Sequence, residues 1–342
     1  MKNGNVQVAQ AATVPTAPSS PKTSRNTVLG AVLGLLLGLG VAFLLERFDR
    51  RIREPKDLED IYRLPLLGVI PESKALSRSA RGTGGTQALL PAGEAEAFHM
   101  IRAHMRYFNV DRELRTIVVV SAAPGDGKTT IARHLATAAA TMGSRVLLME
   151  VDLRRPTLAQ QLDIPSGPGL SDVLIGAVPL NEATQSIAHD APAHEGVAGR
   201  KLDVLVSGAV LPPNPGELIE SHAMETVLER AKAAYDLIVI DTPPLTAVSD
   251  AFPLLRKVDG VIIVGRVARN RRDVAERLHE TLQSVGAPLL GVIANGVKAS
   301  GLGSYAYSYD YAPAAAPPSM LVSPNGSPPA SESLEQPSKV DT

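Results

Sequence analysis

One stretch of the sequence decides the fold: residues 116–130 have the sequence TIVVVSAAPGDGKTT. The first five, Thr116 to Val120, have the apolar, β-branched character of a strand buried on both faces. Two glycines and Lys-Thr-Thr follow, and residues 131–142 then have a helical pattern. Strand, glycine-rich loop and helix in this order are typical of a phosphate-binding loop (P-loop). The strict motif has glycine at position 122, where this chain has alanine, so the surrounding context carries the prediction.

The residue types in this loop suit a nucleotide. Gly125 and Gly127 allow backbone amides to curl around a phosphate, and the N-terminus of the following helix adds partial positive charge. Lys128 is placed to reach the β- and γ-phosphates, and the hydroxyl of Thr129 can ligate magnesium. We therefore predict that ATP and Mg2+ bind at Ala123, Pro124, Gly125, Asp126, Gly127, Lys128, Thr129 and Thr130.

Two more apolar runs end in acidic residues. Residues 237–244, LIVIDTPP, are typical of a Walker B strand ending at Asp241, and residues 146–156, VLLMEVDLRRP, contain Glu150 and Asp152. A single acid at a strand end is commonly a helix cap or a solvated loop residue. Ligands of open α/β sheets, however, gather at the carboxyl ends of the strands, where all three runs end. We predict that Lys128 and Asp241 act catalytically, that Thr129 and Asp241 contact magnesium, and that Glu150 and Asp152 belong to the same site.

Further apolar runs at residues 202–206, 260–264 and 289–294 alternate with helical stretches. Runs this apolar indicate a parallel sheet buried on both faces. The predicted fold is an α/β P-loop NTPase over residues 94–300, with a mostly parallel sheet covered by helices on both faces and preceded by one transmembrane helix.

The transmembrane prediction rests on residues 28–45, an uncharged run of apolar residues and glycines. Eighteen helical residues span about 27 Å, close to the thickness of a bilayer core. A buried core helix is the alternative, but the run is apolar on every face. Five basic residues follow it within residues 46–56, against Lys22 and Arg25 on its N-terminal flank, which places the C-terminal part in the cytoplasm. Residues 1–27 then form a Pro-rich extracytoplasmic tail.

Residues 46–93 are predicted to be a juxtamembrane segment and linker. Within them, residues 55–62 have the pattern of a short helix, and residues 66–71 that of a brief strand or an extended docking segment. Residues 73–91 contain three glycines and are predicted to be flexible.

Composition excludes several classes of protein. The net charge of −1 gives no bulk electrostatic case for nucleic-acid binding. The absence of cysteine excludes disulfides, thiolate metal sites and cysteine nucleophiles. Aromatic residues make up only 4% of the chain, which makes a cluster of tyrosines near the C-terminus unusual.

Together, the P-loop, the strand ending in Asp-Leu-Arg-Arg-Pro and the strand ending in Asp-Thr-Pro-Pro resemble the bacterial tyrosine kinases, relatives of the Min and Par type ATPases. The resemblance extends to the Pro-rich residues 15–21, to the juxtamembrane stretch and to residues 213–218, PNPGEL. Position 123, which carries a signature lysine in the Min and Par branch, is alanine here and favours the kinase branch. The family implies a protein of the bacterial inner membrane with a cytoplasmic catalytic domain, and the one apolar run at residues 28–45 predicts a single pass.

The tyrosine cluster occupies residues 301–311, before a Pro-, Ser- and Ala-rich tail, residues 312–342, that is predicted to be disordered. Strand-like alternation of aromatic residues is the simpler interpretation, but no core is available for them to join. The resemblance implies that they accept phosphate from a neighbouring subunit. The predicted acceptors are Tyr305, Tyr307, Tyr309 and Tyr311.

The resemblance also implies an assembly. In the family, a Glu-x-x-Arg-x-x-Arg motif supports a homo-oligomeric ring, and Glu96, His99 and Arg102 match its spacing with histidine in the middle. A solvated helix face is the alternative interpretation. The second strand of the family carries two aspartates, one proposed as the base and as a magnesium neighbour. Glu150 stands at the first position and Asp152 at the second, so the resemblance implies catalytic roles for both and a magnesium contact from Asp152.

Three functions remain open at this point. The first is an ATP-dependent tyrosine autokinase that controls capsule or exopolysaccharide synthesis and export. Its implied partners are a polysaccharide chain-length regulator or export and polymerase membrane proteins, together with a cognate phosphotyrosine phosphatase. The second is an ATP-dependent scaffold of the same export complex that transfers no phosphate, and the third is a Min or Par type positioning ATPase.

Overall fold

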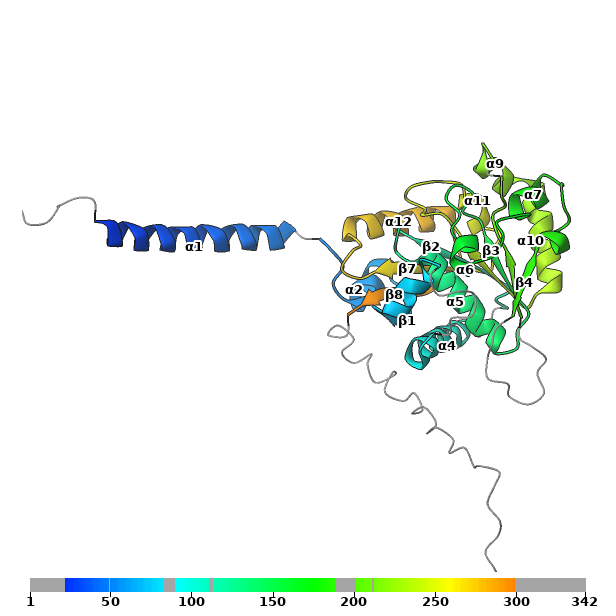
Figure 1. The fold of residues 1–342 in the computed structure, drawn as a ribbon, viewed down its shortest axis with the longest axis horizontal. Coiled ribbons are helices and arrows are strands. Elements are labelled where there is room, and N and C mark those ends of the chain that lie inside the picture. Colours follow the sequence, from blue (N-terminus) through cyan, green and yellow to red (C-terminus); the bar gives the residue numbers. More distant parts are fainter. Residues whose placement is uncertain are drawn as a thin grey trace, which may run out of the picture.

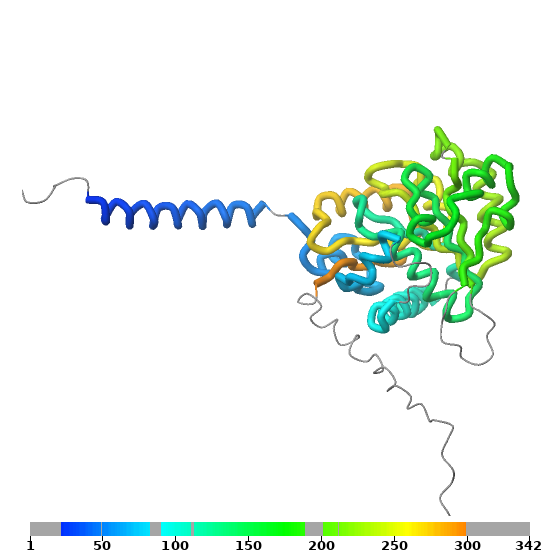
Figure 2. The backbone as a smooth tube through the Cα atoms, in the orientation of Figure 1, coloured from blue at the N-terminus to red at the C-terminus, as the bar shows by residue number. Residues whose placement is uncertain are grey.

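The computed structural model describes residues 22–48, 50–82, 90–110, 113–188, 201–210 and 212–298. An isolated helix, α1 (Thr23–Phe48), stands apart from an α/β domain that contains the rest of the described chain (Figure 1). None of the residues of α1 is buried against the domain, and within the described residues it is the one helix long and apolar enough to cross a membrane. The tube in Figure 2 shows the chain leaving α1 and entering the domain directly.

The domain is built on one eight-stranded sheet of order β1-β8-β7-β2-β6-β3-β5-β4. All neighbouring strands pair in parallel except β4 and β5, which are antiparallel. The strands are β1 (Leu66–Pro71), β2 (Thr116–Ser121), β3 (Val146–Glu150), β4 (Gln185–Ala188), β5 (Lys201–Leu205), β6 (Leu237–Asp241), β7 (Gly260–Arg266) and β8 (Leu289–Val297). The predicted α/β fold with a mostly parallel sheet is confirmed.

Alternate residues of the central strands enter two separate cores. In β2, Val118 and Val120 belong to one core, and Ile117 and Val119 belong to the other, as the alternation of a strand requires. The first core is closed by α2 (Pro55–Tyr62), α7 (Leu170–Leu174), α8 (Leu180–Ala183), α9 (Pro215–Glu220), α10 (His222–Ala234), α11 (Phe252–Leu255) and α12 (Arg272–Val285). The second is closed by α3 (Lys74–Ser79), α4 (Ala92–Phe108), α5 (Lys128–Thr141) and α6 (Leu158–Leu162).

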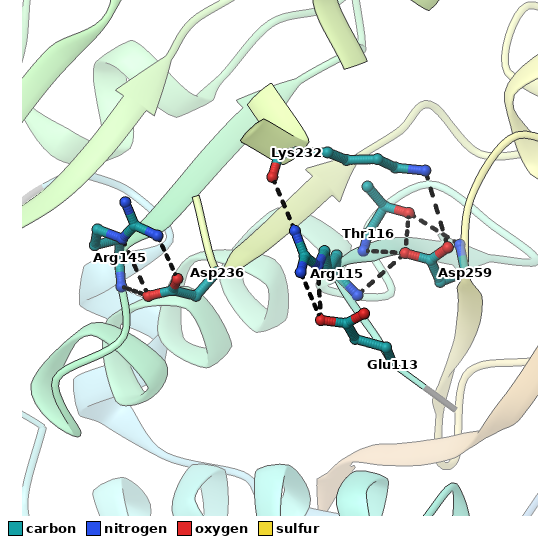
Figure 3. A network of polar contacts seen from close by, with 7 residues as sticks. All are labelled: Glu113, Arg115, Thr116, Arg145, Lys232, Asp236 and Asp259. Atoms are coloured by element: carbon teal, nitrogen blue, oxygen red, sulfur yellow. Dashed lines mark hydrogen bonds and ion pairs between the residues drawn. The ribbon is translucent and has the colours of Figure 1, made fainter. Parts of the chain in front are cut away.

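Polar side chains link neighbouring central strands by hydrogen bonds and ion pairs where those strands begin, at the edge of the sheet opposite their carboxyl ends (Figure 3). Asp259, just before β7, accepts hydrogen bonds from the backbone nitrogen (2.8 Å) and the hydroxyl (2.7 Å) of Thr116, the first residue of β2. Arg145, before β3, pairs with Asp236, before β6, at 2.7 Å. The Arg145–Asp236 pair is exposed and adds little stability, but these contacts join strands that are neighbours in the sheet and so fix their register.

The structure differs from the sequence-based expectations near the N-terminal side of the domain. The juxtamembrane segment is part of the same fold, because β1 pairs with β8 and α2 packs into the first core. The prediction of a flexible linker from residue 73 is wrong for residues 74–79, which form α3. The hydroxyl of Ser73 caps this helix by accepting from the nitrogens of Ala75 and Leu76, and Leu76 is buried.

Candidate nucleotide site

The P-loop residues take up the conformation that their glycines permit. Strand β2 ends at Ser121 and α5 begins at Lys128, with Gly127 as its N-cap residue. Gly125 and Gly127 have φ of +81° and +97°, a region that residues with a β-carbon rarely adopt. The loop therefore curls back at the N-terminus of a 14-residue helix, where the helix dipole favours a phosphate.

Side chains that are distant in the sequence hold the P-loop in this conformation by hydrogen bonds. Asp126 is 2% exposed, and its Oδ2 accepts a hydrogen bond from the nitrogen of Ala123 at 2.8 Å. Its Oδ1 accepts from Nδ2 of Asn270 at 2.8 Å, and Nδ2 of Asn295 donates to its backbone carbonyl at 2.7 Å. Burial raises the pKa of the Asp126 carboxyl, and the hydrogen bonds from Ala123 and Asn270 oppose that shift. Asp126 therefore determines the shape of the loop from within.

Thr129 and Asp241 meet at the start of α5. The Thr129 hydroxyl donates to Oδ2 of Asp241 at 2.6 Å, while Oδ1 of Asp241 is buried and has no hydrogen-bond partner. Burial raises the pKa of Asp241 to about 7, with neighbouring Lys128 acting in the opposite direction. A hydroxyl and a carboxylate with a free oxygen fit Mg2+, which prefers oxygen ligands. In the described residues no group of three or more His, Cys, Asp or Glu gathers at one point.

The two acids of β3 and its following loop are in different environments. Glu150 is fully buried, and three backbone nitrogens donate to it: those of Thr157 (2.7 Å) and Leu158 (2.8 Å) to Oε1, and that of Ser207 (3.2 Å) to Oε2. Asp152 is half-buried and lines the cavity described below, and its Oδ1 accepts from the nitrogens of the next two arginines. Burial also raises the pKa of Glu150. The contacts of Glu150 are those of a residue that holds two loops in place.

The different environments of Glu150 and Asp152 predict that substitutions at these two positions destabilise the protein to different extents. We expect Glu150→Ala to lower the free energy of unfolding by about 3 kcal/mol, because three backbone N–H groups, two of them in buried bonds, lose their acceptor at roughly 1 kcal/mol or more each. The matched Asp152→Ala change, at a half-buried loop position, should cost less than about 1 kcal/mol. Urea unfolding of the two purified variants measures both values, and equal losses would contradict the assignment.

A cavity of about 990 Å³ opens at the carboxyl ends of the strands. Its walls combine the P-loop with the loops after β3, β5 and β6, with the carboxyl ends of β7 and β8, and with the α3 segment. One rim carries Arg154, which forms a two-pronged ion pair with the buried Asp250 at 2.5 and 3.0 Å. The described lining residues from the predicted site are Pro124, Gly125, Gly127, Lys128, Thr129, Thr130 and Asp152. The three motifs predicted from the sequence thus lie at one cavity.

Several residues of this site were missed by the sequence analysis. Asn295 follows an apolar run at the carboxyl end of a strand, so the rule applied to Asp241 also points to it. Asn270 follows β7 in a loop with no motif of its own, and its role is visible only in the structure. The α3 segment was missed because a glycine-rich linker was expected there.

The remaining predicted residues lie away from the cavity or outside the described residues. Glu96, His99 and Arg102 lie on α4; Glu96 is exposed, and Arg102 donates to the hydroxyl of Ser144 at 3.3 Å. Burial and the nearby Arg106 lower the pKa of Arg102. The four tyrosines of residues 305–311 lie outside the described residues.

Comparison with known proteins defines the class first. A family model described as an AAA domain matches residues 114–287, half of the chain, which includes the P-loop and both acidic strands. Tyrosine-protein kinase YwqD of Bacillus subtilis is 36% identical over 213 residues, covering 62% of this chain and 85% of that protein. Tyrosine-protein kinase etk of Escherichia coli is 31% identical over 323 residues, covering 90% of this chain and 43% of that protein. The chain belongs to the family of bacterial tyrosine-protein kinases.

Solved structures agree with this assignment. The kinase domain of Escherichia coli tyrosine kinase ETK matches with a TM-score of 0.61 and 29% identity, over 72% of this chain and 96% of that one. The chimerical protein CapA2B2 matches with a TM-score of 0.60 and 31% identity, over 71% and 99%. The match therefore covers nearly the full length of both solved chains, whereas the chain spans less than half the length of the E. coli etk protein.

Proposed function

We propose that this protein is an ATP- and Mg2+-dependent tyrosine autokinase that phosphorylates Tyr305, Tyr307, Tyr309 and Tyr311 of a neighbouring copy. The observation that carries the proposal is the contact of Thr129 with Asp241 beside Lys128, where a buried carboxylate oxygen remains without a partner. A hydroxyl, a carboxylate and a lysine at a helix N-terminus are the groups that phosphoryl transfer requires.

Each residue has a role in the proposed reaction. Lys128 neutralises charge on the phosphoryl oxygens as the tyrosine hydroxyl attacks the γ-phosphorus and ADP leaves. Thr129 and Asp241 would hold Mg2+, which supplies further charge neutralisation when bound. Asp152 lines the cavity and is the acid best placed to accept the proton of the tyrosine hydroxyl, in contrast to the enclosed Glu150.

The test is an autophosphorylation assay on the full chain in detergent with ATP and MgCl2, read with a phosphotyrosine antibody. We expect a signal in the parent and none in Lys128→Ala or in the variant with all four tail tyrosines changed to Phe. The second variant keeps the nucleotide site, so it should still bind ATP. A parent that binds ATP but forms no phosphotyrosine would overturn the kinase proposal and support an ATP-dependent scaffold.

We further propose that α1 crosses the bacterial inner membrane once, with the kinase domain in the cytoplasm. Its 26 residues, its lack of buried contacts and the basic residues that follow it support this placement. Because Glu96, His99 and Arg102 of α4 match the spacing of the family's ring motif, we also propose that they contact a neighbouring copy in a ring. Proposed partners are the membrane proteins of capsule or exopolysaccharide synthesis and export, and a phosphatase that removes the tail phosphates.

A further inference from the structure

The first residues after α1 pair with the loop that joins β7 to α12. The nitrogen of Ile52 donates to the carbonyl of Asn270 at 2.9 Å, and the carbonyl of Ile52 accepts from Ala268 at 2.8 Å. The nitrogen of Arg272 donates to the carbonyl of Arg50, also at 2.9 Å, which completes an antiparallel pairing. Ile52 is 1% exposed. In Figure 2 this segment is the stretch of chain that joins α1 to the domain. The juxtamembrane chain is therefore fixed to this loop by its backbone.

The same loop contacts the P-loop through one side chain. Asn270 is 4% exposed, and its Nδ2 donates to Oδ1 of Asp126 at 2.8 Å. Its Oδ1 accepts from the backbone nitrogen of Arg266, a residue that lines the cavity. Oδ2 of Asp126 accepts in turn from Ala123, at the start of the glycine-rich part of the loop. Asn270 thus bonds to the juxtamembrane segment with its backbone and to the nucleotide loop with its side chain.

We propose that Asn270 is a positioning residue that couples residues 50–52, next to the membrane helix, to the conformation of the P-loop. The proposal rests on the proposed function, because it concerns the same nucleotide site. The P-loop contains two glycines, whose backbone is free to adopt many conformations, so the shape of the loop depends on groups that hold it from outside. The side chain of Asp126 stabilises the loop from within by accepting from Ala123. Asn270 donates to the other oxygen of Asp126 and so fixes the position of that carboxylate. A change in the pairing of residues 50–52 moves the backbone of Asn270 and so the support of the loop.

The first experiment exchanges the two interacting side chains. In Asn270→Asp two carboxylates face each other, and in Asp126→Asn the amide has one acceptor for two donors, so it loses the bond from Asn270 or that from Ala123. The double variant Asp126→Asn/Asn270→Asp restores it with the donor on the other side, and keeps acceptors for Ala123 and Arg266. Each full-length variant in detergent is titrated with N-methylanthraniloyl-ADP and MgCl2, and melting temperatures are measured without nucleotide.

We expect each single variant to bind the fluorescent ADP about ten- to a hundredfold more weakly than the parent, as for a lost hydrogen bond to a charged group. We expect the double variant to recover to within about threefold of the parent. A double variant that binds as weakly as the singles would overturn the proposal, as would single variants that bind like the parent. A parent that binds no nucleotide would instead refute the proposed function itself.

The second experiment tests the coupling to the membrane side. Ile52→Pro removes the N–H that donates to Asn270, and Ile52→Val keeps it with a similar apolar side chain. We expect Ile52→Pro to weaken ADP binding at least about fivefold relative to Ile52→Val, and to add little further loss in an Asn270→Asp background. Equal affinities in the two Ile52 variants, or fully additive losses, would show that the juxtamembrane pairing does not act through Asn270.

Discussion

The Asp241→Asn variant is expected to melt at a higher temperature than the parent in the absence of nucleotide, and to form less than about 1% of its phosphotyrosine. Asp241 is 1% exposed, one of its oxygens has no hydrogen-bond partner, and its pKa is raised to about 7. The protein therefore holds a carboxylate in an environment that disfavours its charge. A neutral asparagine of the same shape avoids this cost but cannot hold the proposed Mg2+.

The sign of the stability effect follows from the raised pKa. The unfolded chain releases this proton near its ordinary pKa of 3.8, and the folded protein releases it near 7. The stabilising contribution of this group is thus complete below the unfolded pKa and is lost as the pH rises through about 7. The gain in melting temperature of Asp241→Asn should therefore grow between about pH 5 and about pH 8.

Thermal unfolding in EDTA at several pH values measures this effect, with Thr129→Ser as the control. The serine keeps a hydroxyl for Asp241, so that variant should follow the pH dependence of the parent and keep much of its kinase activity. A constant difference between Asp241→Asn and the parent over the whole pH range would rule out a raised pKa at this position.

The second large effect is expected at Gly127. Both P-loop glycines have positive φ, but only a β-carbon on Gly127 would overlap the amide nitrogen of Asn295, whereas one on Gly125 meets no atom within 4 Å. Gly125→Ala should cost the backbone strain alone, about 1 to 2 kcal/mol of unfolding free energy. Gly127→Ala should cost more and also abolish nucleotide binding, because Asn295 must leave the carbonyl of Asp126.

Urea unfolding and titration with fluorescent ADP distinguish these two variants. The pair is matched in residue type and backbone region, so the difference between the variants measures the packing of Asn295 against the loop. Equal losses of stability and unimpaired nucleotide binding in Gly127→Ala would mean that this packing does not matter for the site.

Much of the fold was predictable because its determinants are local. The strands at residues 116–121 and 237–241 are continuous apolar runs, and the structure has β2 and β6 at those residues. The antiparallel strand β4 was not predicted: of its four residues only Ile187 is buried, so it has no apolar run to signal it. The incorporation of β1 into the sheet depends on its pairing with β8, more than 200 residues later, which local patterns do not encode.

The functional site, too, was predictable only where its residues belong to local motifs. Lys128, Thr129 and Asp241 were predicted from motifs, and the structure places them together. Asn270 and Asn295 contact Asp126 from 144 and 169 residues away, and polar residues in loops are too common to single out from one sequence. Glu150 occupies a motif position predicted to be catalytic, yet folding encloses it with three backbone donors. A catalytic role for Glu150 stays a prediction, and that role requires the Glu150 carboxylate to reach the cavity.

The connection between α1 and the domain is short, and this has a consequence for how copies meet. Only residues 49–54 separate the end of α1 from the start of α2, a length of at most about 20 Å. With α1 in the bilayer, the kinase domain stays beside the membrane and diffuses in two dimensions. In the proposed reaction, encounters between one active site and a neighbour's tail then depend on the number of copies per area of membrane. Clustering of copies in the membrane therefore raises the rate of phosphoryl transfer even when the total amount of the protein in the cell is constant.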